Sequence, residues 1–170
     1  MEAEVFTHSS VAEITSEAKS FTEKITKSSE PSNLPTLKVI IIWKDVDTIQ
    51  MVPSKFSPIY GEVNIIRYLN RIGPNEFFYE IDNHEANLAD STLDICYQLS
   101  MKLPVKERQY NLQLLSQRLG KSKFFNDSNG LAIADIAVSS IVKKLCNSNM
   151  KEVPVALTSW LTQVASVTGY

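Results

Sequence analysis

The segment IADIAVSSIV, residues 133–142, constrains this chain most strongly, because apolar residues occupy nearly every face of the helix that it predicts. A helix that is apolar all round must be enclosed by other elements. Helical apolar rows recur from about residue 84 onward, and no strand is predicted there. We therefore expect an all-helical second half that is built around this segment.

Three further helices are predicted to enclose it, each by apolar residues three or four positions apart. The rows are Leu88, Thr92, Ile95 and Leu99; Leu112, Leu115 and Leu119; and Leu157, Trp160, Leu161 and Val164. Gly120 is predicted to end the second of these helices, and Pro154 to begin the third.

The first half has a different character. A short strand is predicted at residues 4–8, and a helix with a capping-box pattern at 10–25. The run LKVIIIWK, 37–44, is β-rich and apolar almost throughout, which predicts a central strand covered on both faces. Residues 49–52 are predicted to fold back on it as a hairpin, and a helix follows in 57–69.

This change of character lies near residues 74–84. It predicts an α/β half at 1–83 and a helical half at 84–170. Hydrophobic residues make up 44% of the chain, which is enough for a buried core. Because 17 Lys and Arg face 19 Asp and Glu, no basic field marks the chain as a nucleic-acid binder. We interpret the pairs Lys121 with Lys123 and Lys143 with Lys144 as solvated surface lysines.

The cysteines predict neither a metal site nor a disulfide framework. Cys96 and Cys146 lie 50 residues apart, without a Cys-x-x-Cys motif or a nearby His. Cys96 is interpreted as a small buried hydrophobic residue. No apolar run reaches about 18 residues, and the N-terminus lacks the pattern of a signal peptide. We expect a protein of the cytosol, with the nucleus as a second compartment, and no cofactor or metal.

The stretch SPIYGEVNIIRYL, 57–69, holds the candidate site. Its helix has one apolar side, formed by Val63, Ile65, Ile66, Leu69 and Ile72. A second stripe follows at spacing i, i+3, i+4 and i+7, formed by Asn64, Arg67, Tyr68 and Arg71. The residues alone leave two readings of the stripe open: the floor of a small-molecule site or a docking face.

The second half resembles the helix–loop–helix core of glutathione-transferase-like domains. The resemblance rests on LLSQRLGKSKFFNDSNGLAIADIAVSSIV, in which Asp135 matches the family Asp. The resemblance implies that this side chain accepts backbone N–H groups at the start of the buried helix. Ala132 stands where the family has a capping Ser or Thr, a loss worth about 0.5–2 kcal/mol.

NIIRYL, residues 64–69, resembles the Ala-Ile-x-Arg-Tyr-Leu run of the third helix of that family. The alignment places Gly61 and Glu62 where the enzymes hold an acid or Gln and a Ser that bind the γ-glutamyl end of glutathione. Glu62 would face the carboxylate of glutathione with like charge. The resemblance therefore implies a chain that is not an enzyme.

The enzymes also activate the thiol of glutathione with a Tyr, Ser or Cys just after their first strand. We interpret residues 4–8 as the second strand of the family, so the first β-α unit and this residue are expected to be missing. The implied fold class is α/β plus all-α and glutathione-transferase-like. An incomplete thioredoxin-like half is followed by an all-helical half.

A narrower resemblance covers most of the chain. THSSV, IIIWKDVDTIQM and SPIYGEVNIIRYL resemble the non-catalytic scaffold proteins of the animal multisynthetase complex. This implies docking onto other transferase-like domains, chiefly that of glutamyl-prolyl-tRNA synthetase. Aspartyl- and lysyl-tRNA synthetases and a second copy of the chain are further expected partners. No membrane and no direct nucleic-acid contact are expected.

The resemblance implies that the stripe Asn64, Arg67, Tyr68 and Arg71 forms the interface. Asp94 is the expected counterpart of an arginine on the partner, or of Arg67 in a second copy. The plainer alternative is a solvated ion pair of Arg67 with Glu62 or Glu80. Two other functions stay open: a glutathione-dependent transferase, and a different translation-linked module of the same fold.

Overall fold

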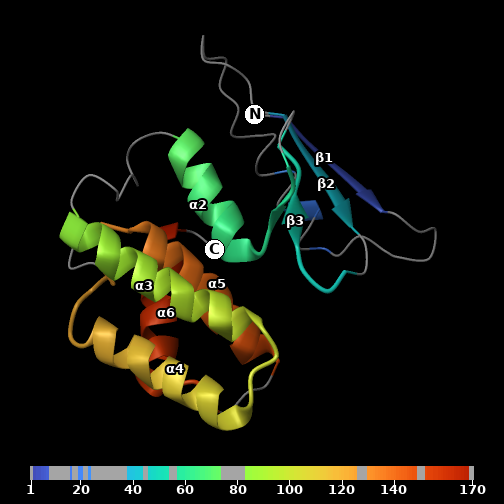
Figure 1. Ribbon diagram of the computed structural model, residues 1–170. Coiled ribbons are helices and arrows are strands. Elements are labelled where there is room, and N and C mark those ends of the chain that lie inside the picture. Colours follow the sequence, from blue (N-terminus) through green and yellow to red (C-terminus); the bar gives the residue numbers. More distant parts are fainter. Residues whose placement is uncertain are drawn as a thin grey trace. The chain divides into compact units, whose positions relative to one another are not determined.

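A computed structural model shows the chain as two units, Met1–Asp47 and Thr48–Tyr170, which are described separately (Figure 1). The structure describes residues 2–7, 16, 19, 20, 23, 38–43, 46–53, 57–73, 83–125, 130–148 and 152–168.

The first unit contains a parallel pair of strands. β1 (Glu2–Thr7) lies beside β2 (Lys38–Trp43), with Glu2 opposite Lys38 and Thr7 opposite Trp43. Parallel neighbours need a crossover connection, and the described residues between them, Ser16, Lys19, Ser20 and Glu23, are helical. The strands predicted at 4–8 and 37–44 are confirmed, with shifted ends. The prediction that the second strand is covered on both faces is wrong, because Ile40 and Ile42, on one face of it, are 54% and 57% exposed.

The β1–β2 pairing concerns the first β-α unit, which we expected to be missing from this chain. Because β1 lies directly beside β2 and parallel to it, one strand and one crossover connection precede β2. Which strand of a complete thioredoxin-like half β1 represents stays a prediction. The residues that follow β1, including Ser9 and Ser10, lie outside the described part of the structure.

The hairpin predicted between residues 49–52 and the strand at 37–44 is wrong, because residues 50–51 pair with a different strand. β3 (Gln50–Met51) pairs antiparallel with β4 (Ile59–Tyr60), with Gln50 opposite Tyr60. Two turn signals compete in this region, the acidic DVDT and the proline-containing segment after β3. The proline-containing connection makes the described hairpin, whereas the acidic segment leads from the first unit into the second.

The rest of the second unit is helical in its described residues. The helices are α2 (Glu62–Ile72), α3 (Asn83–Ser100), α4 (Val105–Leu119), α5 (Ile133–Asn147) and α6 (Val155–Thr168). They confirm most of the apolar rows read from the sequence, but Leu88 on α3 and Leu69 and Ile72 on α2 are exposed, at 46%, 39% and 52%. Gly120, with φ 54°, follows the end of α4, and α6 begins directly after Pro154. None of the described helices is long and apolar enough to cross a membrane.

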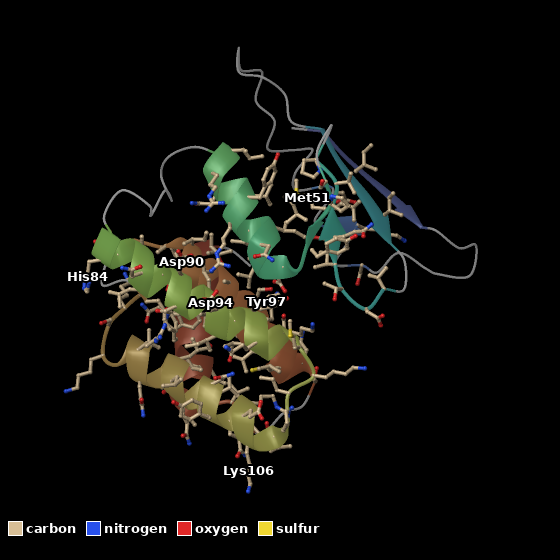
Figure 2. The ribbon with its side chains drawn as sticks, viewed as in Figure 1. Met51, His84, Asp90, Asp94, Tyr97 and Lys106 are labelled. Atoms are coloured by element: carbon tan, nitrogen blue, oxygen red, sulfur yellow. The ribbon has the colours of Figure 1, made fainter. Side chains whose placement is uncertain are left out.

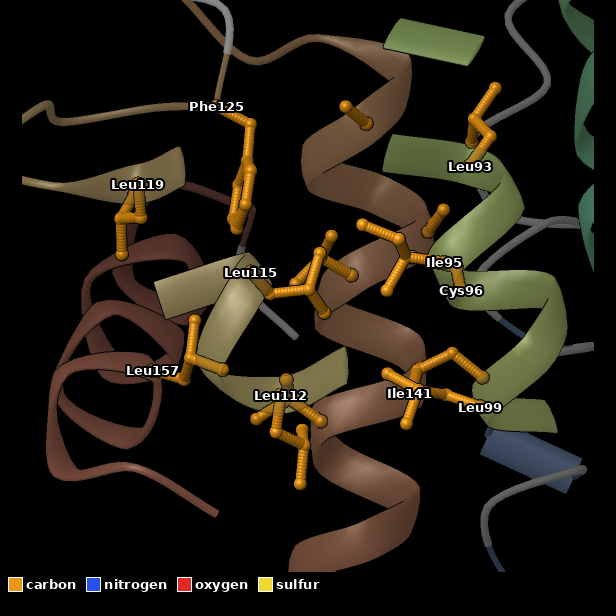
Figure 3. Close-up of a cluster of buried hydrophobic side chains, with 14 of the residues drawn as sticks. Leu93, Ile95, Cys96, Leu99, Leu112, Leu115, Leu119, Phe125, Ile141 and Leu157 are labelled. Atoms are coloured by element: carbon orange, nitrogen blue, oxygen red, sulfur yellow. The ribbon is translucent and has the colours of Figure 1, made fainter. Parts of the chain in front are cut away.

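The prediction that α5 is central is confirmed. It packs against α2, α3 and α6, and α4 packs against α3 and α6 (Figure 1). Leu112, Leu115, Ile141 and Leu157 lie in the resulting core, where each is at most 2% exposed (Figure 3). The alternation of leucine, isoleucine and small residues on α5 lets neighbouring helices approach it closely.

The helix α2 packs on α3 and α5 within the second unit. The predicted boundary between an α/β half at 1–83 and a helical half at 84–170 stays a prediction. For the site, the consequence is that α2 and α3 share one packed body.

Candidate partner interface

The packing of α2 fixes which side of it reaches solvent. Val63 is 1% exposed and Ile66 packs partly buried against the core, so this side of the helix faces α3 and α5. Residues 64 and 67 are three positions apart and lie on one flank of the same helix. They are thereby carried to the seam where α2 crosses α3.

Arg67 connects the two helices at this seam. Its Nε donates to Asp90 Oδ1 at 3.1 Å, and its Nη2 donates to Asp94 Oδ1 at 2.9 Å. Weaker contacts of 3.5 Å join its Nη2 to the Asp90 carbonyl and its Nη1 to Asn64 Oδ1. Asp90 and Asp94 are one turn apart on α3, so one guanidinium spans both carboxylates.

The exposed charge of this cluster is negative. The side chain of Arg67 is 19% exposed, whereas those of Asp90 and Asp94 are 49% and 65% exposed. Two carboxylates around one guanidinium leave a formal charge of about −1. Asp94 therefore offers solvent-facing acceptor capacity, and Arg67 is mainly occupied within its own chain.

The structure brings three of the predicted interface residues together: Asn64, Arg67 and Asp94. Asn64 also donates from Nδ2 to the carbonyl of Tyr60 at 3.0 Å. Arg71 is exposed one turn beyond Arg67, and Tyr68 is half-buried on the adjoining part of the helix. Whether these residues contact a partner stays a prediction.

The alternative interpretation of Arg67, a solvated ion pair with Glu62 or Glu80, agrees with the structure only in part. Arg67 does form ion pairs inside the chain, and its acidic partners among the described residues include Asp90 and Asp94. Glu62 instead accepts a hydrogen bond from the hydroxyl of Ser140 on α5. Glu80 lies outside the described residues.

Sequence reasoning missed Asp90 and Tyr97 on α3. Asp90, Asp94 and Tyr97 follow the side of α3 that meets α2 (Figure 2). Tyr97 is 37% exposed and stands over the start of α2, since a Cβ on Gly61 would lie 3.2 Å from its ring. The spacing i, i+4 and i+7 is a usable signal, but it only acquires meaning once α2 is known to cross there.

The carboxylate of Glu62 at the start of α2 accepts a hydrogen bond from the hydroxyl of Ser140 on α5. By the resemblance, Glu62 stands where the family enzymes carry a serine, so this carboxylate is engaged within the chain. Cys96 is fully buried nearby, as predicted, and burial followed by the charge of Glu62 raises the pKa of its thiol to about 12. The thiol is therefore protonated at neutral pH and is no nucleophile.

Asp135 accepts two backbone hydrogen bonds at the start of α5. Its Oδ1 receives the N–H of Phe125 at 3.0 Å, and its Oδ2 receives the N–H of Ala132 at 2.9 Å. Burial raises the pKa of Asp135, while these N–H donors act in the opposite direction. The methyl group of Ala132 accepts no hydrogen bond, so within the described residues the side-chain acceptor at this helix start is Asp135.

Metal chemistry has no built site in the described part of the chain. No group of three or more His, Cys, Asp and Glu side chains lies there in an arrangement that could hold a metal ion. The arrangement at the α2–α3 seam is instead a fixed polar surface with charges of both signs.

Together, the strand pairs and the helical bundle define a glutathione-transferase-like fold with a thioredoxin-like first part. A family described as a thioredoxin-like domain matches residues 1–60. Over 162 residues, the chain is 37% identical to a protein of Drosophila melanogaster named "Probable aminoacyl tRNA synthase complex-interacting multifunctional protein 2". The match covers 94% of this chain and 48% of that protein, so the chain spans about half the length of this relative. The resemblance read from the sequence is thereby confirmed.

Proposed function

We propose that this domain is a non-catalytic scaffold that docks onto other proteins of an aminoacyl-tRNA synthetase complex. The name of the Drosophila relative, which is 37% identical over 94% of the chain, supports this assignment. The structural observation that carries it is the cluster of Arg67, Asp90 and Asp94 at the seam of α2 and α3.

This cluster suits docking because its geometry exists before a partner arrives. Arg67 holds both carboxylates in place, which reduces the side-chain entropy that binding must remove. The exposed carboxylate of Asp94 can accept a bidentate hydrogen bond from an arginine of the partner. Tyr97 adds aromatic contact area beside it, a residue type enriched at interface centres.

The proposed partner is the transferase-like domain of glutamyl-prolyl-tRNA synthetase. Aspartyl- and lysyl-tRNA synthetases and a second copy of the chain are further candidates, in the cytosol and the nucleus. Each of these candidate partners must present an arginine or lysine to the exposed carboxylate of Asp94. In this proposal Arg71 meets an acid of the partner, and Asn64 and Tyr68 line the rim of the contact.

The test is the mass of the chain, alone and mixed with that synthetase domain, by light scattering after gel filtration. We expect a mixed complex with the wild type. Asp94→Lys should abolish it, because the substitution turns the exposed acceptor into a cation. Glu107→Lys makes the same charge change at an exposed site on α4 and should leave the complex intact.

Circular dichroism melts of both variants separate lost binding from lost folding. Arg67→Glu should also abolish the complex, but with a lower melting temperature, because it breaks the tie between α2 and α3. A complex that withstands both Asp94→Lys and Arg67→Glu would move the interface away from this seam. The absence of any complex would reject this synthetase as the partner.

A further inference from the structure

One end of the helical bundle joins two chain connections that are far apart in sequence. Residues 101–104 lead from α3 into α4, and residues 148–154 lead from α5 into α6. Arg108 fastens the two together, since its Nε donates to Glu152 Oε2 at 2.7 Å and its Nη2 to Glu152 Oε1 at 3.1 Å. Its Nη1 also donates to the carbonyl of Leu103 at 3.2 Å.

Positive charge gathers on this joined end. Lys102 and Lys106 come from the α3–α4 side, and Lys143 and Lys144 from the last part of α5. All are exposed, and none of them forms an ion pair with another residue in the described parts of the chain. Glu152 is committed to Arg108. The other described acids near these lysines are Glu107, beside Lys106, and Glu62, which accepts a hydrogen bond from Ser140 one turn before Lys144.

The same end exposes aliphatic side chains. Met101 is 49% exposed, Val105 51% and Val155 79%. Val105 precedes Arg108 by three positions on α4, and Val155 follows Glu152 by three positions. Val105 therefore lies one turn before Arg108 on α4, and Val155 begins α6 close in sequence to Glu152.

We propose that this end, named the basic end and defined by Met101, Lys102, Val105, Lys106, Lys143, Lys144 and Val155, is a second docking surface. Its occupant is an acidic amphipathic helical segment of a partner protein. Carboxylates of the segment would meet the lysines, while its apolar side chains would cover the valines and Met101. The inference rests on the proposed scaffold function, because a protein that joins two others needs two separate surfaces.

A protein segment fits this surface better than a nucleic acid does. Nucleic-acid sites rely on arginine forks and on aromatic rings that stack on bases. The guanidinium of Arg108 is already engaged by Glu152, and neither described connection carries an exposed aromatic residue. Exposed valines beside flexible lysines instead match a helix that has one apolar and one acidic face.

The probe is a synthetic helix of about 18 residues, made of Leu and Glu with leucines at i, i+3, i+4 and i+7. It is titrated into the isotope-labelled full chain at about 50 mM salt, with affinity measured by fluorescence anisotropy. Amide shifts should concentrate on residues 101–108 and 143–156. A scrambled peptide of equal composition should bind more weakly, since it lacks the apolar face.

Charge reversal provides the matched comparison. Replacing Lys102, Lys106, Lys143 and Lys144 by Glu should weaken the helix at least about tenfold. Lys121→Glu with Lys123→Glu reverses the charge just after the opposite end of α4 and should change affinity less than about twofold. If the fourfold variant fails to fold, Lys102→Glu with Lys106→Glu gives the same test. Val155→Ser should also weaken binding, against Val167→Ser as the exposed control on α6.

Three results would overturn the basic end as a docking surface for an acidic helix. These are unchanged affinity in the charge-reversed protein, amide shifts that map elsewhere, and tighter binding of a uridine homopolymer or of anionic lipid vesicles. Asp94→Lys should leave the probe bound. If synthetase binding fails while the probe still binds at this end, the proposed partner is wrong and the second surface stands.

Discussion

A guanidinium between two carboxylates changes what the α2–α3 surface can offer. Arg67 alone reads as a cation that awaits a partner's acid, as the sequence suggested. With Asp90 and Asp94 in contact, the more exposed groups are the acids, and the partner should bring the cation. Whether this surface attracts a cation or an anion thus depends on residues that lie 23 and 27 positions from Arg67 in the chain.

The first prediction at this scale concerns Asp135. Asp135→Ala should lower the free energy of unfolding by about 2–3 kcal/mol, because it leaves the N–H groups of Phe125 and Ala132 without their acceptor. Ile136→Ala, at a 40% exposed neighbour, should cost less than about 1 kcal/mol. Urea unfolding of the three proteins measures the difference. Equal losses in both variants would show that the backbone contacts of Asp135 add little to stability.

The second prediction concerns pH and Glu152. Hydrogen bonds from Arg108 lower the pKa of Glu152 below its ordinary value of 4.5. A lowered pKa in the folded state means that the carboxylate contributes stability above pH 4.5, and that this contribution is lost as pH falls through the lower value.

The comparison is between wild type and Glu152→Gln. Their free energies of unfolding should differ most at neutral pH and converge as the pH falls from 4.5 through the lowered pKa of Glu152. Glu107→Gln, which removes an exposed acid beside Arg108 on α4, is the matched control. A gap between wild type and Glu152→Gln that stays constant from neutral to acid pH would contradict the coupling of Glu152 to Arg108.

At the scale of elements, the helical half was largely predictable. Leu112, Leu115 and Leu119 repeat at helical spacing, and the apolar composition of α5 predicts that it is buried. Patterns of this kind can be recognised from a short stretch of sequence. The start of α4 after Pro104 and its end before Gly120 are likewise local events.

Pairings between distant elements were not predictable in the same way. Glu62 meets Ser140 across 78 positions, and nothing in either neighbourhood identifies the other. The hairpin partner of residues 50–51 was missed because adjacent turn signals had similar strength. For the candidate site, the stripe on α2 was visible in the sequence, whereas the acids that neutralise Arg67 required the packing of α2 on α3.

The third prediction concerns the start of α2. Gly61 has φ 84° and donates its N–H to the Ile49 carbonyl at 2.9 Å, while the ring of Tyr97 lies above it. Gly61→Ala should lower the free energy of unfolding by about 1–3 kcal/mol, because a Cβ is strained at this φ and crowds Tyr97. Gly130→Ala, where a Cβ would meet nothing within 4 Å, should change it by no more than about 0.5 kcal/mol.

Thermal melts and urea titrations provide both values. Adding Tyr97→Ala to Gly61→Ala separates the two causes, since removal of the ring relieves crowding but not backbone strain. If Gly61→Ala proves as mild as Gly130→Ala, the positive φ does not govern how α2 begins.

At the scale of the whole molecule, the question is whether a transferase-like fold here serves chemistry or assembly. The fold alone decides nothing, because function depends on the groups placed in a site. Two observations favour assembly: Ser140 donates a hydrogen bond to Glu62, the residue that by resemblance replaces a glutathione-binding serine, and burial raises the pKa of the Cys96 thiol to about 12. The relative's name points the same way, although the chain spans 48% of that protein.

The direct pairing of β1 with β2 suggests a specific version of the alternative function, a glutathione-dependent transferase. If β1 is the first strand of the fold, Ser9 and Ser10 follow it where the enzymes carry their thiol-activating residue. Glutathione recognition would still require the carboxylate of Glu62 to face the carboxylate of the γ-glutamyl end. Like charges at that position disfavour binding, and Ser140 provides Glu62 with an intramolecular partner.

The fourth prediction follows from this conflict. Calorimetric titration of the full chain with glutathione, up to about 10 mM, should give no saturable heat, whereas a glutathione transferase treated identically should. Glu62→Gln removes the charge while it keeps the size and one hydrogen-bond acceptor for Ser140, so it should bind no better if the site is closed by structure as well as by charge. Saturable binding by wild type that Ser9→Ala with Ser10→Ala abolishes would make the chain a glutathione-binding protein. Binding gained only in Glu62→Gln would show that the carboxylate of Glu62 alone prevents the chain from binding glutathione.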